Sequence, residues 1–342
     1  MNGIGDKYID SLVLELKSHS VSEIEIARCI SYATKLRENK LPVIFDRDHL
    51  AHLLRLRPAE LSHLIHNQDS HYSIFKLPKR KSGYREISAP SPILKQIQRW
   101  ILDNILQNMK VSNCAFGFIP GRSIVDNASK HINQDSIVNV DLKDFFLSVK
   151  FQTIFRIFFY YGYSKEVSFY LSRLCTYHDS LPQGAPSSPY LSNIALLKVD
   201  KRLEFLAKKF SATYTRYADD ITFSGKGNLG NIVPIVGNIL KEEGYSINDG
   251  KTRIAFKHQR QEVTGLLVND QAVRIPKPFK RGLFQEIYYC QKYGVNSHMK
   301  HKGITKMFYK EHLYGKAYYI LMVEPKIGIR ALNALDSLDW TY

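Results

Sequence analysis

The sequence predicts an α+β fold in which helices pack on a small, mostly antiparallel sheet. Apolar residues recur at helical spacing near both ends of the chain. Between residues 136 and 268, short runs rich in β-branched and aromatic residues alternate with helical segments. At 342 residues and 44% hydrophobic content, the chain can bury a substantial core in one large domain or in two to three subdomains.

The first third of the chain is predicted to be helical apart from one strand pair. Pro90 precedes a segment in which Ile93, Ile97, Ile101 and Ile105 recur at four-residue steps, which is typical of an amphipathic helix. The expected elements are helical stretches over 8–38 and 47–66, strands over 72–75 and 85–88 joined by the loop 79–83, and a helix over 91–109.

The remaining two thirds alternate strands with helices and then become helical. The expected elements are a strand over 136–141, helices over about 151–176, a loop at 180–189, a helix over about 190–209, two short strands around Asp219, a helix over about 231–243, strands near 252–256 and 262–268, and basic helices from 275 onward.

The charge of the chain indicates a polyanionic partner. It has 48 Lys and Arg against 32 Asp and Glu, a net charge of +16. Residues 271–342 alone hold 12 basic and 5 acidic side chains, which suits a duplex backbone. A generally basic protein without such a partner is the alternative. Aromatic residues, including the Tyr288-Tyr289 pair, offer surfaces for stacking on bases, although most such rings belong to protein cores.

Membrane and secretion signals are not evident in the sequence. No run of about 18 uncharged apolar residues occurs, and the N-terminus lacks a basic region that leads into an apolar run. The four cysteines are scattered without CxxC spacing, which argues against a zinc site or a disulfide framework. We therefore expect a cytoplasmic protein without a membrane partner.

Three carboxylates point to metal-dependent phosphate chemistry. Asp219 and Asp220 adjoin in a tight turn between two strand signals, and Asp141 ends the strand signal 137–140. Like charges held together repel one another, so such a cluster stabilises a fold poorly but binds cations well. Three carboxylates at neighbouring strand ends can carry two Mg²⁺ ions for displacement at a phosphate. The sequence therefore indicates a nucleotidyl-transfer site.

The order of four motifs resembles the palm of a reverse transcriptase. They are Val140-Asp-Leu-Lys-Asp-Phe-Phe-Leu-Ser148, Leu181-Pro-Gln-Gly-Ala-Pro-Ser-Ser-Pro189, Tyr217-Ala-Asp-Asp220 and Gly244-Tyr-Ser-Ile-Asn-Asp-Gly-Lys-Thr252. Two further segments, Asn127-Ala-Ser-Lys-His131 and Val263-Thr-Gly265, resemble elements of retron reverse transcriptases. The resemblance covers roughly residues 70–270.

This resemblance implies a right-hand polymerase with fingers, a palm built on a small antiparallel sheet, and a helical thumb. The expected boundaries are a helical N-terminal extension at 1–45, fingers at 46–125, a palm at 126–270 with finger elements near 150–180, and a basic helical thumb at 271–342.

The resemblance also implies catalytic roles. Asp141 and Asp219 would ligate both Mg²⁺ ions, and Asp220 would complete the site. Lys251 would protonate the leaving pyrophosphate. A surface lysine that follows a turn is the alternative for Lys251.

The deoxynucleotide would meet six residues. Cations of the 79–83 loop and the next strand would hold the triphosphate, an aromatic ring would exclude a 2′-hydroxyl, and a Gln-Gly pair would lie against the template–nucleotide pair. The alternatives are a solvated charge run for the two loop cations, core packing for the aromatic ring and a surface turn for the Gln-Gly pair. These residues are Lys79, Arg80, Arg85, Phe146, Gln183 and Gly184.

RNA and primer contacts are expected from Asn127, His131, Val263, Thr264 and Gly265. A single histidine at the end of a short helical stretch is usually structural, and this alternative stays open for His131.

The resemblance implies an RNA-directed DNA polymerase that copies its own structured noncoding RNA, with that RNA as template and primer. Such enzymes start from a 2′-hydroxyl of a branching guanosine, make a multicopy single-stranded DNA–RNA hybrid (msDNA), and serve in antiphage defence in the bacterial cytoplasm. A separate effector or toxin protein and a host RNase H acting in trans are the expected partners. A reverse transcriptase of the group II intron or diversity-generating type, or a non-catalytic RNA-binding scaffold, is the alternative.

Overall fold

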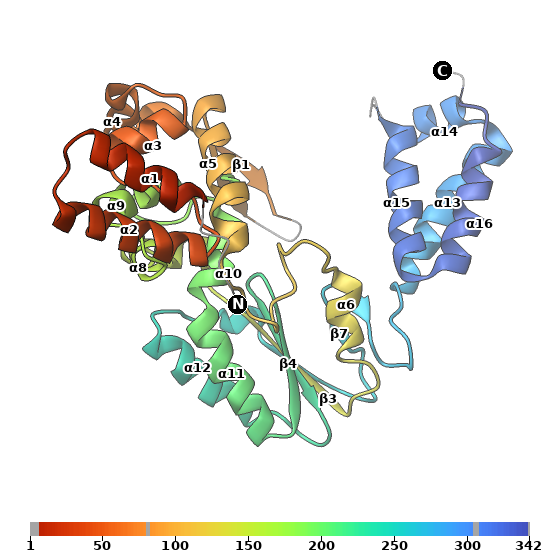
Figure 1. Cartoon of the computed structure of the whole chain (residues 1–342). Helices are drawn as coiled ribbons and strands as arrows, with labels where there is room; N and C mark the ends of the chain where they lie inside the picture. The colour runs from red at the N-terminus through yellow and green to blue at the C-terminus, as the bar shows by residue number, and fades with distance from the viewer. Residues whose placement is uncertain (1–6, 80–82, 304–307, 341–342) are drawn as a thin grey trace. The chain divides into compact units, whose positions relative to one another are not determined.

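The computed structural model describes residues 7–79, 83–303 and 308–340, and it confirms the predicted α+β class. The chain divides into two compact units (Figure 1). The first unit comprises Met1–Asn113, Lys143–Lys201 and Lys241–Tyr245, and the second comprises Cys114–Leu142, Arg202–Leu240 and Ser246–Tyr342. The polypeptide therefore passes repeatedly between the two units.

The first unit is mainly helical and contains one antiparallel hairpin. Its hairpin pairs Tyr72 with Pro90 and Pro78 with Tyr84, so the strands are longer than the sequence indicated. Its elements are α1 (Lys7–Ser18), α2 (Glu23–Glu38), α3 (Arg47–Leu53), α4 (Pro58–His66), η1 (Gln68–His71), β1 (Tyr72–Pro78), β2 (Tyr84–Pro90), α5 (Pro92–Asn104), η2 (Leu106–Asn108), α7 (Phe145–Ser148), α8 (Phe151–Tyr160), α9 (Lys165–Cys175) and α10 (Ser188–Ala195).

Helix starts in this unit follow from side-chain caps. The side chain of Ser22 accepts a hydrogen bond from Glu25 N at the start of α2, and Ser164 caps α9 through Val167 N. The predicted helical stretch 8–38 is therefore two helices. Helix α5 is amphipathic as predicted, but its buried face includes Leu94, Ile97 and Ile101, whereas Ile93 is exposed.

The second unit contains a four-stranded antiparallel sheet in the order β4-β5-β3-β6. Five of the six residues of β3 are buried, so this strand lies at the centre of the packing. The elements are α6 (Ile124–Ser129), β3 (Ser136–Asp141), β4 (Ala212–Tyr217), β5 (Asp220–Gly225), η3 (Asp249–Lys251), β6 (Arg253–Phe256), β7 (Glu262–Val263) and β8 (Leu266–Leu267). Helices α11 (Leu197–Lys209) and α12 (Ile232–Glu242) continue from one unit into the other.

The predicted strand over 262–268 is a two-stranded hairpin. Glu262 pairs with Leu267 and Val263 with Leu266. The two residues between the strands, Thr264 and Gly265, have φ of 48° and 82°. Two consecutive positive φ values are characteristic of tight hairpin turns, which explains the break in the strand.

The C-terminal helical bundle consists of α13 (Lys277–Tyr293), α14 (Val295–His301), α15 (Tyr309–Val323) and α16 (Pro325–Asp336) (Figure 1). Helices α15 and α16 cross closely, because a Cβ atom on Gly328 would lie 2.2 Å from Leu321 Cα. Lys280 Nζ lies 2.7 Å from a Glu324 carboxylate oxygen, and the same oxygen accepts a hydrogen bond from Ile275 N. This contact fixes the entry of the chain into the bundle.

Within the described residues, every helix falls short of the length and hydrophobicity needed to cross a bilayer. The four cysteines are all described and none forms a disulfide, in agreement with the sequence prediction.

Candidate active site

Strand register brings the predicted carboxylates to one end of the sheet. Asp141, the last residue of β3, lies directly opposite Asp220, the first residue of β5. Asp219 occupies the turn between β4 and β5, and its carbonyl accepts a hydrogen bond from Leu142 N at 3.0 Å. Ala218 adopts a φ of 58°, which turns the chain sharply before the Asp pair. All three aspartates thus belong to the second unit.

Two polar side chains from the 244–252 motif contact Asp141. Its carboxylate accepts hydrogen bonds from Asn248 Nδ2 at 3.0 Å and Lys251 Nζ at 2.9 Å. Asn248 N also donates to the Asp141 carbonyl at 2.8 Å, which fixes the turn that carries Lys251. The Asp141 hydrogen bond raises the pKa of Lys251. The sequence pattern assigned Asn248 no role of its own, whereas these contacts show that it orients Asp141.

The electrostatics of the cluster show an excess of negative charge. Burial of its carboxylate, followed by repulsion from Asp219 and Asp141, raises the pKa of Asp220 to about 6. Lys251 opposes this shift only in part. Solvent reaches the residue, although the surrounding protein removes much water from its carboxylate. A cation would relieve this repulsion, so the charge of the cluster fits a metal.

No group of three or more His, Cys, Asp or Glu side chains across residues 7–79, 83–303 and 308–340 is arranged to enclose a metal ion. The fit of the aspartates to Mg²⁺ therefore rests on their chemistry and charge. Carboxylate oxygens are the ligands that Mg²⁺ prefers, and it commonly keeps waters and substrate phosphates as its remaining ligands.

A buried histidine supports the strands that carry the Asp pair. The ring of His131 lies 2.6 Å from Ser224 Oγ on β5 and 2.7 Å from Thr215 Oγ1 on β4. Burial lowers the pKa of His131 to about 3, so the ring is neutral near pH 7. Because the side chain is fully buried, the structure does not support its predicted contact with RNA. Its environment fits the alternative that the sequence left open, a structural role for His131.

Arg216 is a supporting residue that the sequence reasoning missed. Its side chain is fully buried, and Nη1 donates to the Ala218 carbonyl at 3.0 Å, directly before the Asp pair. Its backbone joins the 114–116 segment through hydrogen bonds with Cys114 O and Phe116 N. The sequence feature that could have indicated this role is an arginine within a strand otherwise rich in Tyr and Thr.

The residues expected at the nucleotide lie in the first unit. Ser88 N donates to Gln183 O at 2.8 Å, so β2 and the 181–189 loop lie side by side. Gly184 has a φ of 136°, and a Cβ atom there would lie 2.8 Å from Ser88 O, so the position requires glycine. Arg85 is exposed on the same strand.

The other three nucleotide residues have different settings. Phe146 is half-buried in α7, with its ring centroid 5.2 Å from that of Phe145. Lys79 is exposed at the end of β1, and its N–H donates to Gly83 O at 2.9 Å. Arg80 lies outside the described residues. The nucleotide roles of all six residues stay predictions.

The remaining predicted RNA contacts differ in their access to solvent. Asn127 on α6 and Val263 on β7 are buried. Both polar side-chain atoms of Asn127 are without a hydrogen-bond partner among the described residues. Thr264 and Gly265 reach the surface at the β7–β8 turn, where Thr264 Oγ1 donates to Ile124 O at 3.3 Å. Of the five predicted RNA contacts, only the two turn residues thus reach solvent.

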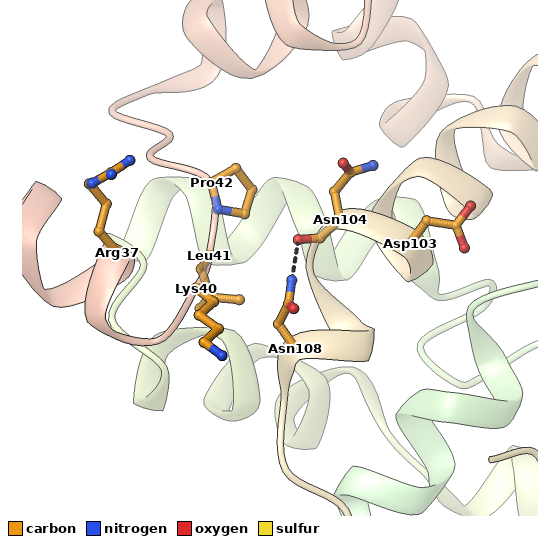
Figure 2. Close-up of a pocket in the computed structure, with 7 residues that line it drawn as sticks. All are labelled: Arg37, Lys40, Leu41, Pro42, Asp103, Asn104 and Asn108. Atoms are coloured by element: carbon orange, nitrogen blue, oxygen red, sulfur yellow. Dashed lines mark hydrogen bonds between the residues drawn. The ribbon is translucent and has the colours of Figure 1, made fainter. Parts of the chain in front are cut away.

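Two cavities within the described residues lie away from these residues. In the first unit, a polar cavity of about 500 Å³ lies between α2 and α5, where Arg37 and Lys40 line one wall and Asp103 and Asn108 line the other (Figure 2). A second cavity, of about 590 Å³, lies in the C-terminal helical bundle. None of the sequence-predicted site residues lines either cavity.

Comparison with known proteins adds independent evidence. Residues 77–269 match the family described as reverse transcriptase (RNA-dependent DNA polymerase). The chain is 34% identical over 346 residues to the retron Mx162 reverse transcriptase of Myxococcus xanthus, covering 90% of this chain and 70% of that protein. It is 33% identical over 314 residues to the retron Ec86 reverse transcriptase of Escherichia coli, covering 90% of this chain and 94% of that protein.

The chain also has a weak similarity to a solved structure. It is telomerase from Candida albicans in complex with a fragment of telomeric RNA, with a TM-score of 0.46 and 13% identity. The similarity covers 77% of this chain and 62% of that one.

Proposed function

The chain belongs to the retron-type reverse transcriptases, which are RNA-directed DNA polymerases of the right-hand fold, and from this premise we propose that it copies one cognate structured noncoding RNA into DNA. The observation that carries the chemistry is the convergence of Asp141, Asp219 and Asp220 at one end of the sheet. Burial of the Asp220 carboxylate, together with repulsion from Asp219 and Asp141, raises its pKa to about 6, and bound cations would relieve this cost of ionisation.

Asp141, Asp219 and Asp220 would hold two Mg²⁺ ions, which would lower the pKa of the primer hydroxyl and offset charge on the transferring phosphate. The protein contributes the placement of these carboxylates. Asn248 orients Asp141, Arg216 fixes the turn before Asp219, and His131 joins the two strands that flank the pair. Preorganised charge of this kind reduces the reorganisation that the reaction would otherwise require.

Lys251 would donate a proton to the leaving pyrophosphate. Its Nζ is held by Asp141, so the ammonium stays beside the carboxylates, and its raised pKa keeps the group protonated near pH 7. A general acid must be protonated and held beside the reacting groups, and these two properties of Lys251 support the role.

Deoxynucleotide binding would use Arg85 and the 79–80 cations for the triphosphate, and Gln183 and Gly184 against the template–nucleotide pair. Phe146 would select deoxynucleotides by excluding a 2′-hydroxyl. The contact of β2 with the 183–184 backbone supports the assignment of Arg85 and Gly184 to one functional region.

The noncoding RNA would serve as template and as primer, through a 2′-hydroxyl of a branching guanosine, and the product would be msDNA. A separate effector protein, a host RNase H and a role in cytoplasmic antiphage defence complete the proposal. The net charge of +16 supports a polyanionic partner, and the similarity to two retron enzymes supports the choice of lineage.

The test combines a catalytic variant with a charge-matched control. The double variant Asp219→Asn with Asp220→Asn should abolish DNA synthesis on the neighbouring noncoding RNA while RNA affinity is retained. Asp103→Asn with Asp270→Asn removes the same charge at exposed sites and should retain synthesis. Unchanged synthesis in the Asp219/Asp220 variant would refute the metal assignment.

Product analysis tests the priming mechanism separately. The DNA made by the unmodified protein should stay joined to a guanosine of the RNA through a 2′–5′ bond. An unbranched, freely primed product would contradict the proposed retron chemistry even if synthesis itself is robust.

A further inference from the structure

The cavity in the C-terminal helical bundle has the chemistry of a binding pocket. It occupies about 590 Å³ between α13 and α14, a volume within the range of small-ligand sites. Its lining consists of aromatic, imidazole, amide, hydroxyl and ammonium groups, without an aliphatic side chain. An anchor pocket for an apolar protein side chain would have the opposite composition.

One wall of the pocket is held by a half-buried carboxylate. Glu286 accepts hydrogen bonds from His298 Nε2 at 2.7 Å, Lys302 Nζ at 2.6 Å and Tyr309 OH at 2.7 Å. Although burial opposes ionisation, these bonds hold the pKa of Glu286 at about 2. The carboxylate is therefore charged and fully engaged, and it fixes His298 and Lys302 in the pocket wall.

Aromatic rings form a stacking platform along the same wall. The Tyr289 ring lies 5.5 Å from the His298 ring at an interplanar angle of 25°, and 6.2 Å from the Tyr293 ring at 22°. Tyr293 is 55% exposed and Lys292 Nζ lies 5.1 Å from its ring centroid, so a further flat group would stack on the ring beside this ammonium. Near-parallel rings with an open end are typical of surfaces that stack nucleobases.

Polar groups in the pocket are available to a ligand. Gln285, Ser297 and His301 line the pocket, and their side chains form no hydrogen bond or ion pair with any other described residue. An amide, a hydroxyl and an imidazole together can donate to and accept from the edge of a base or a ribose.

The surrounding charge favours a nucleotide over an uncharged ring. From residue 277 to 303 the sequence has one acidic residue, Glu286, and six basic residues, namely Lys277, Lys280, Arg281, Lys292, Lys300 and Lys302. Lys280 pairs with Glu324 and Lys302 pairs with Glu286, and the other four basic residues leave the field around the pocket positive.

We propose that this pocket binds a single unstacked nucleotide of the nucleic acid that the protein carries, with the base against Tyr293 and Tyr289 and its phosphate near Lys302. The inference rests on the proposed function for the identity of the polyanion. The pocket would be a subsite for one unpaired nucleotide. The proposal therefore predicts that the protein binds some structured RNAs more tightly than others, beyond the general attraction of its positive charge for phosphates.

The test compares two hairpin RNAs closed by the same non-nucleotide linker and with equal numbers of base pairs, one fully paired and one that also carries a single unpaired 2-aminopurine. The full-length protein should bind the second RNA about tenfold more tightly, and the fluorescence of the unpaired base should fall on stacking. Tyr293→Ala should remove this preference and leave affinity for the paired RNA unchanged. Tyr318→Ala is the matched control, because Tyr318 lies outside the pocket and is 57% exposed.

Gln285→Ala tests the polar part of the pocket and should reduce the preference several-fold without loss of quenching. The same hairpin made of DNA, and free adenosine monophosphate, identify the source of the nucleotide. A preference confined to RNA assigns the pocket to the template, whereas an equal preference for DNA assigns it to either strand of the hybrid.

Equal affinity of the unmodified protein for the two RNAs, or an unchanged preference in Tyr293→Ala, would overturn the proposal. So would a Tyr293→Ala variant that weakens both RNAs equally, since this indicates general surface contact. DNA synthesis on a conventionally primed RNA by the same preparations tests the proposed polymerase function independently of the binding preference.

Discussion

Lys251 Nζ lies 2.9 Å from the carboxylate of Asp141, a residue 110 positions earlier in the chain. The general acid proposed for the reaction is thus held by a carboxylate proposed to ligate metal. A cation on Asp141 and the ammonium of Lys251 would compete for the same negative charge. The position of Lys251, which the turn at η3 sets, should therefore affect both the affinity of the site for metal and the proton transfer.

Replacing Lys251 by Met should therefore separate these two effects. The Mg²⁺ concentration for half-maximal synthesis should fall several-fold, because a positive charge beside three carboxylates is removed. Turnover at saturating Mg²⁺ should fall on the order of a hundredfold, since the proton donor is lost. Metal titration of synthesis rates measures both quantities. Lys251→Arg keeps the charge, and an equal fall in metal requirement in that variant would contradict the explanation.

Asp220 should make the metal-free protein less stable as pH rises from about 4 to about 6. Its pKa is raised to about 6 from an ordinary value of 3.8, so in this window the folded state binds more protons than the unfolded state. The stabilising contribution is present at low pH and is lost as pH rises through 6. Because solvent reaches the residue, screening reduces the effect to about 1 kcal/mol.

Asp220→Asn should accordingly stabilise the metal-free protein at pH 7 by about 1 kcal/mol and have little effect at pH 4. Urea unfolding in the presence of a chelator measures the difference. A variant that is equally or less stable than the parent at pH 7 would show that repulsion within the cluster is not felt by the folded state.

His131→Ala should lower the free energy of unfolding by about 3 kcal/mol, because it creates a cavity and leaves two buried hydroxyls unpaired. Thr215→Val removes one hydrogen bond while nearly keeping the volume, and should cost about 1 kcal/mol. Denaturant unfolding provides the comparison. RNA affinity of the folded variants should be unchanged, and a selective loss of RNA binding in His131→Ala would restore the RNA contact predicted from the sequence.

Gly117→Ala should reduce turnover on the order of tenfold to a hundredfold with RNA affinity retained. A Cβ atom there would lie 2.7 Å from Ala218 N, so the turn that carries Asp219 must move. Single-nucleotide incorporation kinetics measure the loss. Gly282→Ala is the control, since a Cβ atom at Gly282 meets nothing within 4 Å. Comparable turnover in the two variants would mean that the Ala218 turn tolerates displacement.

Gly328→Ala should destabilise the C-terminal helical bundle by about 3 kcal/mol, because its Cβ atom would overlap the backbone of Leu321. Gly315→Ala, on α15 with open space around it, should instead stabilise by up to about 1 kcal/mol. Hydrogen exchange resolved by segment distinguishes the bundle from the sheet. Increased exchange in β3–β5 with a protected bundle would contradict the assignment.

The sequence predicted the Asp cluster well because local signals define it. Strand patterns end at Asp141 and flank Asp219 and Asp220, and antiparallel pairing then brings strand ends together. The burial of His131 was not predictable in this way. Its partners, Thr215 and Ser224, lie 84 and 93 positions away, so no local pattern connects them. Arg216 was missed for the same reason, because its contact with Ala218 depends on the turn conformation.

The central position of β3 imposes an order of events on the nascent chain. Strand β3 is complete at Asp141, but both of its partners, β5 and β6, begin at or beyond Asp220. The intervening segment Lys143–Lys201 belongs to the first unit. That whole segment must therefore be synthesised before β3 can pair with β5 and β6. Strands β1 and β2, by contrast, are close in sequence and can pair as soon as both have been synthesised. The end of the sheet that carries the three aspartates can therefore be completed only after β6 has been synthesised, and until then β3 exposes apolar surface that favours aggregation.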